Sequence, residues 1–263
     1  MADVTSHKPG SFSWPELSTS DQTAAVAFYR ALFGWDLNDV PMGPGATYSM
    51  FRMRGRDVAA AAGQQPQEKQ AGVPPHWNSY ITVANVDESA KKAQSLGGKM
   101  LAGPFDVMDA GRMAVIQDPT GAVFQIWQAN RSIGAMILNE PGALCWTELT
   151  TSDTKAAEAF YTGLFGWTAK QSAPSSVMEY TEFSVDGTPS IGMMAKPKEM
   201  PAHIPSYWMP YFQVAHVDPS AAKVKELGGK VMVPPQDIPN TGRFAIVVDP
   251  QGAMFAIFEF KQS

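Results

Sequence analysis

Cysteine is almost absent from this chain of 263 residues, and the single residue, Cys145, cannot form a disulfide within the chain. That scarcity fits a reducing compartment. No apolar run approaches the ~18 residues of a transmembrane helix, and the first ten residues contain no apolar core of the length found in signal peptides. We therefore expect a cytoplasmic protein with no membrane partner.

Basic residues are few and dispersed. Twenty Lys and Arg against twenty-five Asp and Glu give a net charge of -5, and no basic cluster occurs, so we expect no nucleic-acid partner. The four histidines are His7, His76, His203 and His216, which we place in the N-terminal tail, in linkers or at a helix cap. Transition metals usually need three or four His, Cys or carboxylate ligands, so histidine offers little for such a site.

What the sequence does contain is a duplication. Residues 14–35, WPELSTSDQTAAVAFYRALFGW, return as residues 146–167, WTELTTSDTKAAEAFYTGLFGW, with 15 of 22 positions identical at an offset of 132. Each copy predicts a short strand, an Asp N-cap and an amphipathic helix that ends at a glycine. Each copy is therefore the start of a βα unit.

A second βα unit follows in each half. In the first half it comes after residues 63–75, which we interpret as a Gln/Pro-rich linker. Each unit continues into short strands, which predicts a βαβββ module. One face of such a module lies under its helix, and the other must curl against another module to be buried. We expect an α+β fold of two domains, 1–135 and 136–263, and the sequence leaves open which modules pair. The four modules are residues 12–62, 77–128, 144–195 and 208–260.

This pattern resembles the vicinal oxygen chelate superfamily, which includes glyoxalase I, extradiol dioxygenases, fosfomycin-resistance proteins and bleomycin-binding proteins. The resemblance depends on the FYxxLFGW motif of the opening units and on a GRxAxxxDPxGAxF motif at residues 111–124 and 242–255. The WxELxTSD opening in a two-domain chain of this length is also similar to a bacterial group named as mycobacterial antigens or hydroxylases. The resemblance implies two glyoxalase-like domains.

In that superfamily the metal ligands lie on the first and last strands of paired modules. The last strands of the first and third modules, residues 58–62 and 191–194, contain no acid or imidazole. None of the other matched positions carries His, Cys or a carboxylate, so we expect no metal and no cofactor. Those positions are Trp14, Trp146, Asn78, Met209, Gln125 and Ala256.

The opening strand alternates, which places Leu17 under the helix and Trp14, Glu16 and Ser18 on the concave face. Trp146, Glu148 and Thr150 repeat this arrangement. An aromatic ring beside a carboxylate suits a ligand with an apolar ring and a hydrogen-bond donor or positive charge. Under the structural alternative, the tryptophan fills the sheet and the glutamate pairs with Arg112 or Arg243.

The leading functional hypothesis is a metal-independent binding protein of the bleomycin-resistance type, which sequesters an aromatic or amphipathic compound. The first alternative is a lyase or hydroxylase of the same superfamily, with Glu16 and Glu148 as catalytic acid or base or with a non-standard metal site. The second is an interaction protein whose cavities are filled by side chains. We expect a monomer that acts as an internal pseudo-dimer. The predicted ligand-binding residues are Trp14, Asn78, Tyr80, Gln125, Trp146, Met209 and Tyr211.

Overall fold

A computed structural model describes residues 3–43, 45–171, 179–201 and 203–261, so the outermost residues of the two expected domains lie outside the described residues. The first half forms two βαβββ modules joined by a short helix, α2, where we had expected only a linker. The elements of this half are β1 (Phe12–Thr19), α1 (Gln22–Phe33), β2 (Asp36–Pro41), β3 (Thr47–Met53), β4 (Arg56–Gly63), α2 (Pro66–Gln70), β5 (His76–Thr82), α3 (Val86–Ser95), β6 (Lys99–Val107), β7 (Gly111–Gln117) and β8 (Val123–Ala129).

The second half repeats the order of the first without a counterpart of α2 among the described residues. No helix in the described part of the chain has the length and apolar character needed to cross a membrane. The elements of this half are β9 (Leu144–Thr151), α4 (Thr154–Phe165), β10 (Thr168–Gln171), β11 (Tyr180–Val185), β12 (Thr188–Ala195), β13 (Tyr207–Gln213), α5 (Val217–Glu226), β14 (Lys230–Ile238), β15 (Gly242–Val248) and β16 (Met254–Phe260).

Each half forms one eight-stranded sheet, in the order β2-β3-β4-β1-β5-β8-β7-β6 and β10-β11-β12-β9-β13-β16-β15-β14. The opening strands of the two modules pair antiparallel at the centre of each sheet, while β1·β4 and β5·β8 are parallel. Consecutive modules therefore pair with each other, which answers the question that the sequence left open. The predicted α+β fold of two tandem glyoxalase-like domains is confirmed.

The predicted caps fix where the opening helices begin and end. Asp21 and Asp153 accept hydrogen bonds of 3.0 Å from the amides of Ala24 and Ala156, which satisfies donors of the first helical turn. Each helix ends at a glycine with a left-handed backbone, φ 74° and 72°. These local signals set the direction in which the helix runs back along its sheet.

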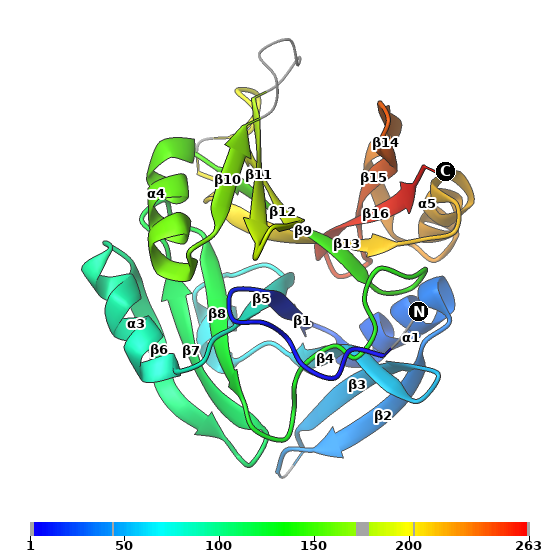
Figure 1. Cartoon of the computed structure of the whole chain (residues 1–263). Coiled ribbons are helices and arrows are strands. Elements are labelled where there is room, and N and C mark those ends of the chain that lie inside the picture. The colour runs from blue at the N-terminus through cyan, green and yellow to red at the C-terminus, as the bar shows by residue number, and fades with distance from the viewer. Residues whose placement is uncertain (1–2, 44, 172–178, 202, 262–263) are drawn as a thin grey trace.

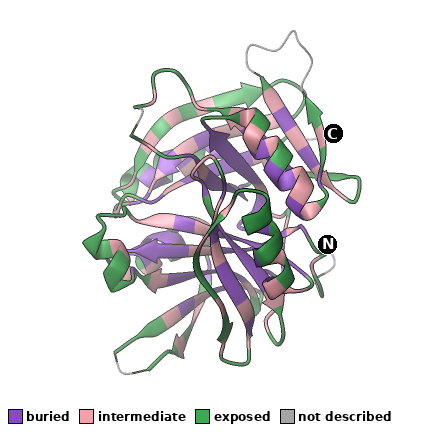
Figure 2. Ribbon diagram, turned by 90° about the vertical axis from the view of Figure 1, so that its left-hand side faces the viewer, coloured by how far each residue is buried: buried purple, intermediate pink, exposed green. Residues whose placement is uncertain are grey.

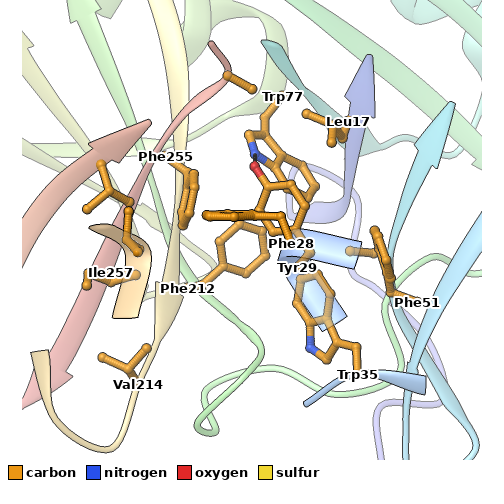
Figure 3. Close-up of a cluster of buried hydrophobic side chains, with 14 of the residues drawn as sticks. Leu17, Phe28, Tyr29, Trp35, Phe51, Trp77, Phe212, Val214, Phe255 and Ile257 are labelled. Carbon is orange, nitrogen blue, oxygen red and sulfur yellow. Dashed lines mark hydrogen bonds between the residues drawn. The ribbon is translucent and has the colours of Figure 1, made fainter. Parts of the chain in front are cut away.

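The helix-bearing faces of the two sheets pack against each other, so each hydrophobic core is shared between the halves. One core combines α1 and the β1–β4 region with α5 and the β13–β16 region, and the other combines α3 with α4 and their strands. Figure 3 shows Phe28 and Tyr29 of α1 facing Phe212 and Phe255 of the second half. Full burial of each such side chain contributes roughly 1.5–3 kcal/mol.

Because the helix faces meet in the middle, the two sheets curl away from each other. In Figure 1 the outer strands of the first sheet, β2–β3 and β6–β7, extend downward, and those of the second sheet, β10–β11 and β14–β15, extend upward. Figure 2 shows buried residues along the central strands and exposed residues on the outer strands and outer helix surfaces. We call the outward-facing faces of the two curled sheets the first cup and the second cup.

A pair of buried hydrogen bonds crosses between the halves at equivalent positions. The hydroxyl of Tyr29 donates to Asp249 at 3.0 Å, and that of Tyr161 donates to Asp118 at 2.9 Å. Each tyrosine belongs to the FYxxLFGW motif, and each aspartate belongs to the Asp-Pro turn of the other half. The two repeated motifs therefore join the halves to each other.

We predict that Tyr29→Phe destabilises the protein by about 1–3 kcal/mol, because it leaves the buried Asp249 carboxylate without one of its donors. Urea unfolding of Tyr29→Phe, Asp249→Asn and the double variant measures the coupling between the two side chains. Tyr161→Phe is the matched variant and is expected to cost a similar amount. A coupling energy near zero would contradict a role for this contact in joining the halves.

Candidate ligand-binding site

Strand alternation sets the floor of the first cup. Leu17 lies in the core shared with α1, whereas Trp14, Glu16 and Ser18 alternate with it and face the other side of the sheet. Across the central ladder, Trp14 pairs with Tyr80 and Glu16 pairs with Asn78. The expected orientation of the opening strand is therefore what the structure shows.

Glu16 is the centre of the first cup, since both of its carboxylate oxygens accept hydrogen bonds. Tyr48 donates to Oε2 at 2.6 Å, while Tyr80 and the amide of Asn78 donate to Oε1 at 3.1 and 3.3 Å. The indole of Trp14 donates to the Tyr48 hydroxyl at 2.9 Å. Because that hydroxyl accepts from Trp14, its own proton is directed to Glu16.

A chain of amides extends this network to the next strand. The Gln125 Nε2 group donates to Oδ1 of Asn78 at 2.8 Å, and Asn78 in turn donates to Glu16. Gln125 is only 4% exposed, and its Oε1 atom has no hydrogen-bond partner among the described residues. An acceptor held in this way favours a hydrogen-bond donor beside it.

The second cup repeats the carboxylate and its two phenols. Tyr180 donates to Oε2 of Glu148 at 2.7 Å and Tyr211 donates to Oε1 at 2.8 Å, while Trp146 donates to the Tyr180 hydroxyl at 3.1 Å. A side chain at Gly192 would place its Cβ atom 1.9 Å from that hydroxyl, so the approach of Tyr180 needs glycine there.

The second cup lacks the chain of side-chain amides that Asn78 and Gln125 form in the first cup. Met209 occupies the position of Asn78 beside Glu148, and Ala256 occupies the position of Gln125 beside Tyr211. Both residues are buried and belong to an apolar cluster with Tyr211 and Phe258. The first cup is therefore polar next to its carboxylate, and the second is apolar there.

Burial raises the pKa of both glutamates above the usual range for a carboxyl group, against the opposing effect of the tyrosine hydrogen bonds. Tyr48, Tyr80 and Tyr211 have their pKa values raised well above the ordinary phenol value, first by burial and then by the nearby carboxylate. The phenols therefore remain protonated donors at neutral pH.

The structural alternative in which the glutamates pair with Arg112 or Arg243 is not what the structure shows, and the position expected for His76 was wrong. Arg112 binds Asp87 and Asp106 at 2.8 and 2.9 Å, and Arg243 binds Asp218 and Asp237 at 2.6 and 2.8 Å. Both arginines lie near the start of their strands, β7 and β15, and bind exposed carboxylates. His76, which we had placed in a linker, is the first residue of β5 and lies 3.7 Å from Glu68.

The donor chemistry does not fit the metal that the superfamily implies. Around Glu16 the potential ligands are one carboxylate, whose oxygens both already accept hydrogen bonds, together with amide, phenol and indole groups. Around Glu148 the amides are replaced by Met209 and Ala256. Within the described residues, no group of three or more His, Cys, Asp and Glu side chains is arranged to hold a metal ion.

The sequence interpretation missed Tyr48 and Tyr180, which orient the carboxylates from β3 and β11. A signal was available, because the two tyrosines are equivalent in the repeat and lie on alternating strands. The predicted residues Trp14, Asn78, Tyr80 and Gln125 come together around Glu16. Trp146, Met209 and Tyr211 come together around Glu148.

Comparison with known proteins agrees with this architecture. The family model described as Glyoxalase/Bleomycin resistance protein/Dioxygenase superfamily matches residues 11–126 and 143–257. A protein of Mycobacterium tuberculosis (strain CDC 1551 / Oshkosh) named "Putative glyoxylase CFP32" is 42% identical over 260 residues, which cover 98% of each chain. "Anthracycline biosynthesis protein DnrV" of Streptomyces peucetius is 32% identical, over 98% of this chain and 96% of that one.

Solved structures share the fold at low sequence identity. The Mn(II)-bound glyoxalase from Novosphingobium aromaticivorans aligns with a TM-score of 0.66 at 15% identity, over 96% of this chain and 82% of that one. The 2,3-dioxygenase LapB from Pseudomonas sp. KL28 aligns with a TM-score of 0.64 at 13% identity, over 100% and 94% of the two chains. With the family model matching both halves, the chain belongs to the Glyoxalase/Bleomycin resistance protein/Dioxygenase superfamily.

Proposed function

We propose that this protein is a metal-independent small-molecule binder that holds an aromatic or amphipathic compound in its cups. The observation that carries the proposal is the carboxylate at the centre of each cup, which two phenols orient among aromatic and apolar side chains. Each of the proposed domains, 1–135 and 136–263, provides one such site. In this proposal Glu16 and Glu148 contact the ligand directly.

The charge and burial of the glutamates support the choice of ligand. A desolvated carboxylate is stabilised in its ionised form by a cation or a strong hydrogen-bond donor placed beside it. The aromatic walls, which include Trp14 and Trp127 in the first cup and Trp146 and Phe258 in the second, favour a flat apolar body. An aromatic compound with an amine or hydroxyl group combines both properties.

The difference between the cups supports two ligand preferences. In the first cup, Asn78 and Gln125 add polar atoms beside Glu16, which favours a compound with several polar groups. In the second cup, Met209 supplies a flexible apolar surface that adapts to rings of different shape. The relative named for anthracycline biosynthesis is consistent with a ligand that contains fused aromatic rings.

An enzyme is the second candidate, and a specific observation favours it. A carboxyl group whose pKa is raised by burial, next to phenols that remain protonated, is a suitable pair for proton transfer without a cofactor. The relative named as a glyoxylase points in the same direction. Under this alternative, Glu16 or Glu148 accepts a proton from the bound compound and a tyrosine stabilises the resulting oxyanion.

We predict that Glu148→Gln gains stability relative to wild type as the pH rises above about 4.3, the ordinary pKa of glutamate. Because burial raises the pKa of Glu148, the folded chain holds this proton more tightly than the unfolded chain. The stability that this proton gives the wild type is fully present below the pKa of Glu148 in the unfolded chain, and it is lost as the pH rises through the pKa in the folded chain. The difference in unfolding free energy changes by up to about 1.4 kcal/mol per pH unit within that window.

Urea unfolding of the two proteins from pH 4 to pH 8, in steps of about half a unit, measures this difference. The matched control is Glu226→Gln, which changes an exposed glutamate at the end of α5. Its stability relative to wild type should stay nearly constant over the same range. If Glu148→Gln instead loses stability steadily toward pH 8, the glutamate is held ionised by a partner that we have not identified.

We predict that aromatic cations or quinones raise the melting temperature of the wild type and not that of Glu16→Gln combined with Glu148→Gln. A ligand at 100 times its Kd stabilises the fold by about 2.7 kcal/mol, which a thermal melt resolves. Since neither glutamate holds a structural arginine, the substitutions should not cost the ~3–5 kcal/mol of a broken buried ion pair. Glu16→Gln alone and Glu148→Gln alone then identify which cup binds the compound.

The same samples separate the two candidate functions. A binder leaves the absorption spectrum of each compound stable over hours and responds equally after treatment with a chelator. An enzyme converts a compound at a rate that falls in Glu16→Gln or Glu148→Gln. The binder is excluded if no aromatic compound in the panel stabilises the wild type, or if a chelator removes the stabilisation.

A further inference from the structure

The two halves differ in what covers the N-terminal ends of two of their strands. Residues 130–143 join β8 to β9 and are called the linker between the halves from here on. This linker crosses the N-terminal ends of β1 and β4, just before these strands begin to pair in parallel at Glu16 and Ala60. The amide of Ala135 donates to the carbonyl of Ser13 at 2.7 Å, and the amide of Met136 donates to the carbonyl of Asp57 at 2.8 Å. The linker thus closes the gap between the two strands with main-chain hydrogen bonds.

Side-chain size fixes the linker in that gap. Gly134 has φ 97°, and a Cβ atom added to it would lie 2.4 Å from the carbonyl oxygen of Ser13, so only glycine allows this approach. Ala135 is fully buried, and Ile137 is only 2% exposed. A glycine followed by small and apolar residues is therefore the sequence that this gap accepts.

The corresponding gap in the second half lies between the N-terminal ends of β9 and β12. At the offset of 132, Cys145 is equivalent to Ser13 and Pro189 to Asp57, and Pro189 pairs with Ser184 as Asp57 pairs with Arg52. Among the described residues, no main-chain amide outside the sheet donates to the carbonyl of Cys145 or of Pro189. The backbone geometry that receives the linker is therefore repeated without the linker.

The N-terminal tail, which is the equivalent of the linker in sequence, turns to the first half. Its Val4 amide donates to the carbonyl of Met136 at 2.8 Å, and Asp3 binds Arg56 at 2.6 Å. A cavity of about 280 Å³ remains beside β9 and β12. Its wall includes Cys145, Trp146, Thr188 and Ser190, with the tail residues Ser6 and His7 on the opposite side.

We propose that this cavity binds an extended peptide segment in which a glycine is followed by small and apolar residues. The segment crosses β9 and β12 as residues 134–137 cross β1 and β4, and its amides donate to the carbonyls of Cys145 and Pro189. Main-chain hydrogen bonds give much of the affinity when an extended peptide is captured by a sheet. The cavity shares Trp146 with the second cup, but Glu148 does not line it, so the proposal does not depend on the ligand of the cups.

The charges around the cavity support a neutral peptide. Lys8, which lies in the cavity wall, is paired with Asp186. The His7 Nε2 group donates to the carbonyl of Ala135 at 2.8 Å, and burial lowers the pKa of His7, so it is neutral at pH 7. The remaining side chains of the wall are hydroxyl, amide, thiol, indole, phenyl and aliphatic groups.

The test uses the full chain and a synthetic peptide of residues 132–138, SIGAMIL, with two lysines added for solubility and a photoreactive analogue in place of methionine. We expect saturable binding and, after irradiation, adducts in residues 144–147 or 188–190. The control peptide has valine in place of glycine and should bind at least about tenfold more weakly, since its side chain meets a carbonyl oxygen.

A protein variant provides a second check. Thr188 is exposed at the cavity wall, so Thr188→Trp obstructs the cavity without changing the core, and it should reduce peptide binding by about the same factor. The proposal is overturned if both peptides bind equally, or if the adducts lie at cup residues other than Trp146. It is also overturned if no saturable binding occurs up to about 1 mM, where the standard binding free energy is only about -4 kcal/mol.

Discussion

The buried contact between each FYxxLFGW tyrosine and the Asp-Pro turn of the other half is the constraint on which the architecture depends. Tyr29 reaches Asp249 and Tyr161 reaches Asp118 through cores to which both halves contribute. Since the helices are used to join the halves, the opposite face of each sheet is directed away from the partner half. The outward direction of both cups is therefore a consequence of how the duplicated domains pack.

Duplication gave both cups the same central carboxylate, and local substitutions then made them different. Glu16 and Glu148 are each held by two phenols. One comes from the strand that pairs with the glutamate's own strand, β5 or β13, and the other comes from β3 or β11. Asn78 and Gln125 continue the polar network in the first cup, whereas Met209 and Ala256 end it in the second. One fold thus supports two environments around the same chemical group.

The sequence predicted the elements that short-range rules control. The Asp caps, the glycine helix ends and the alternation that turns Glu16 away from Leu17 each depend on a few neighbouring residues, and they follow local physical chemistry. It did not predict that Tyr48 and Tyr180 hold the carboxylates, because Tyr48 and Glu16 are separated by a helix and a strand. It left the partner of Arg112 open for a similar reason, since Asp87 of α3 and Asp106 of β6 come together at this arginine only in the folded chain.

The sequence could not predict which modules pair, because the cores are shared between the halves. Every module has a bare helix face and a bare concave face, and hydrophobic periodicity is the same whichever partner covers them. Two identical halves would leave two identical gaps at their strand ends, but a single chain has only one linker between its halves. That linker occupies the gap at Ser13 and Asp57, whereas no described main-chain amide outside the sheet donates to the carbonyls of Cys145 and Pro189. The asymmetry of this protein therefore follows from the covalent connection between its halves as well as from the substitutions that separate them.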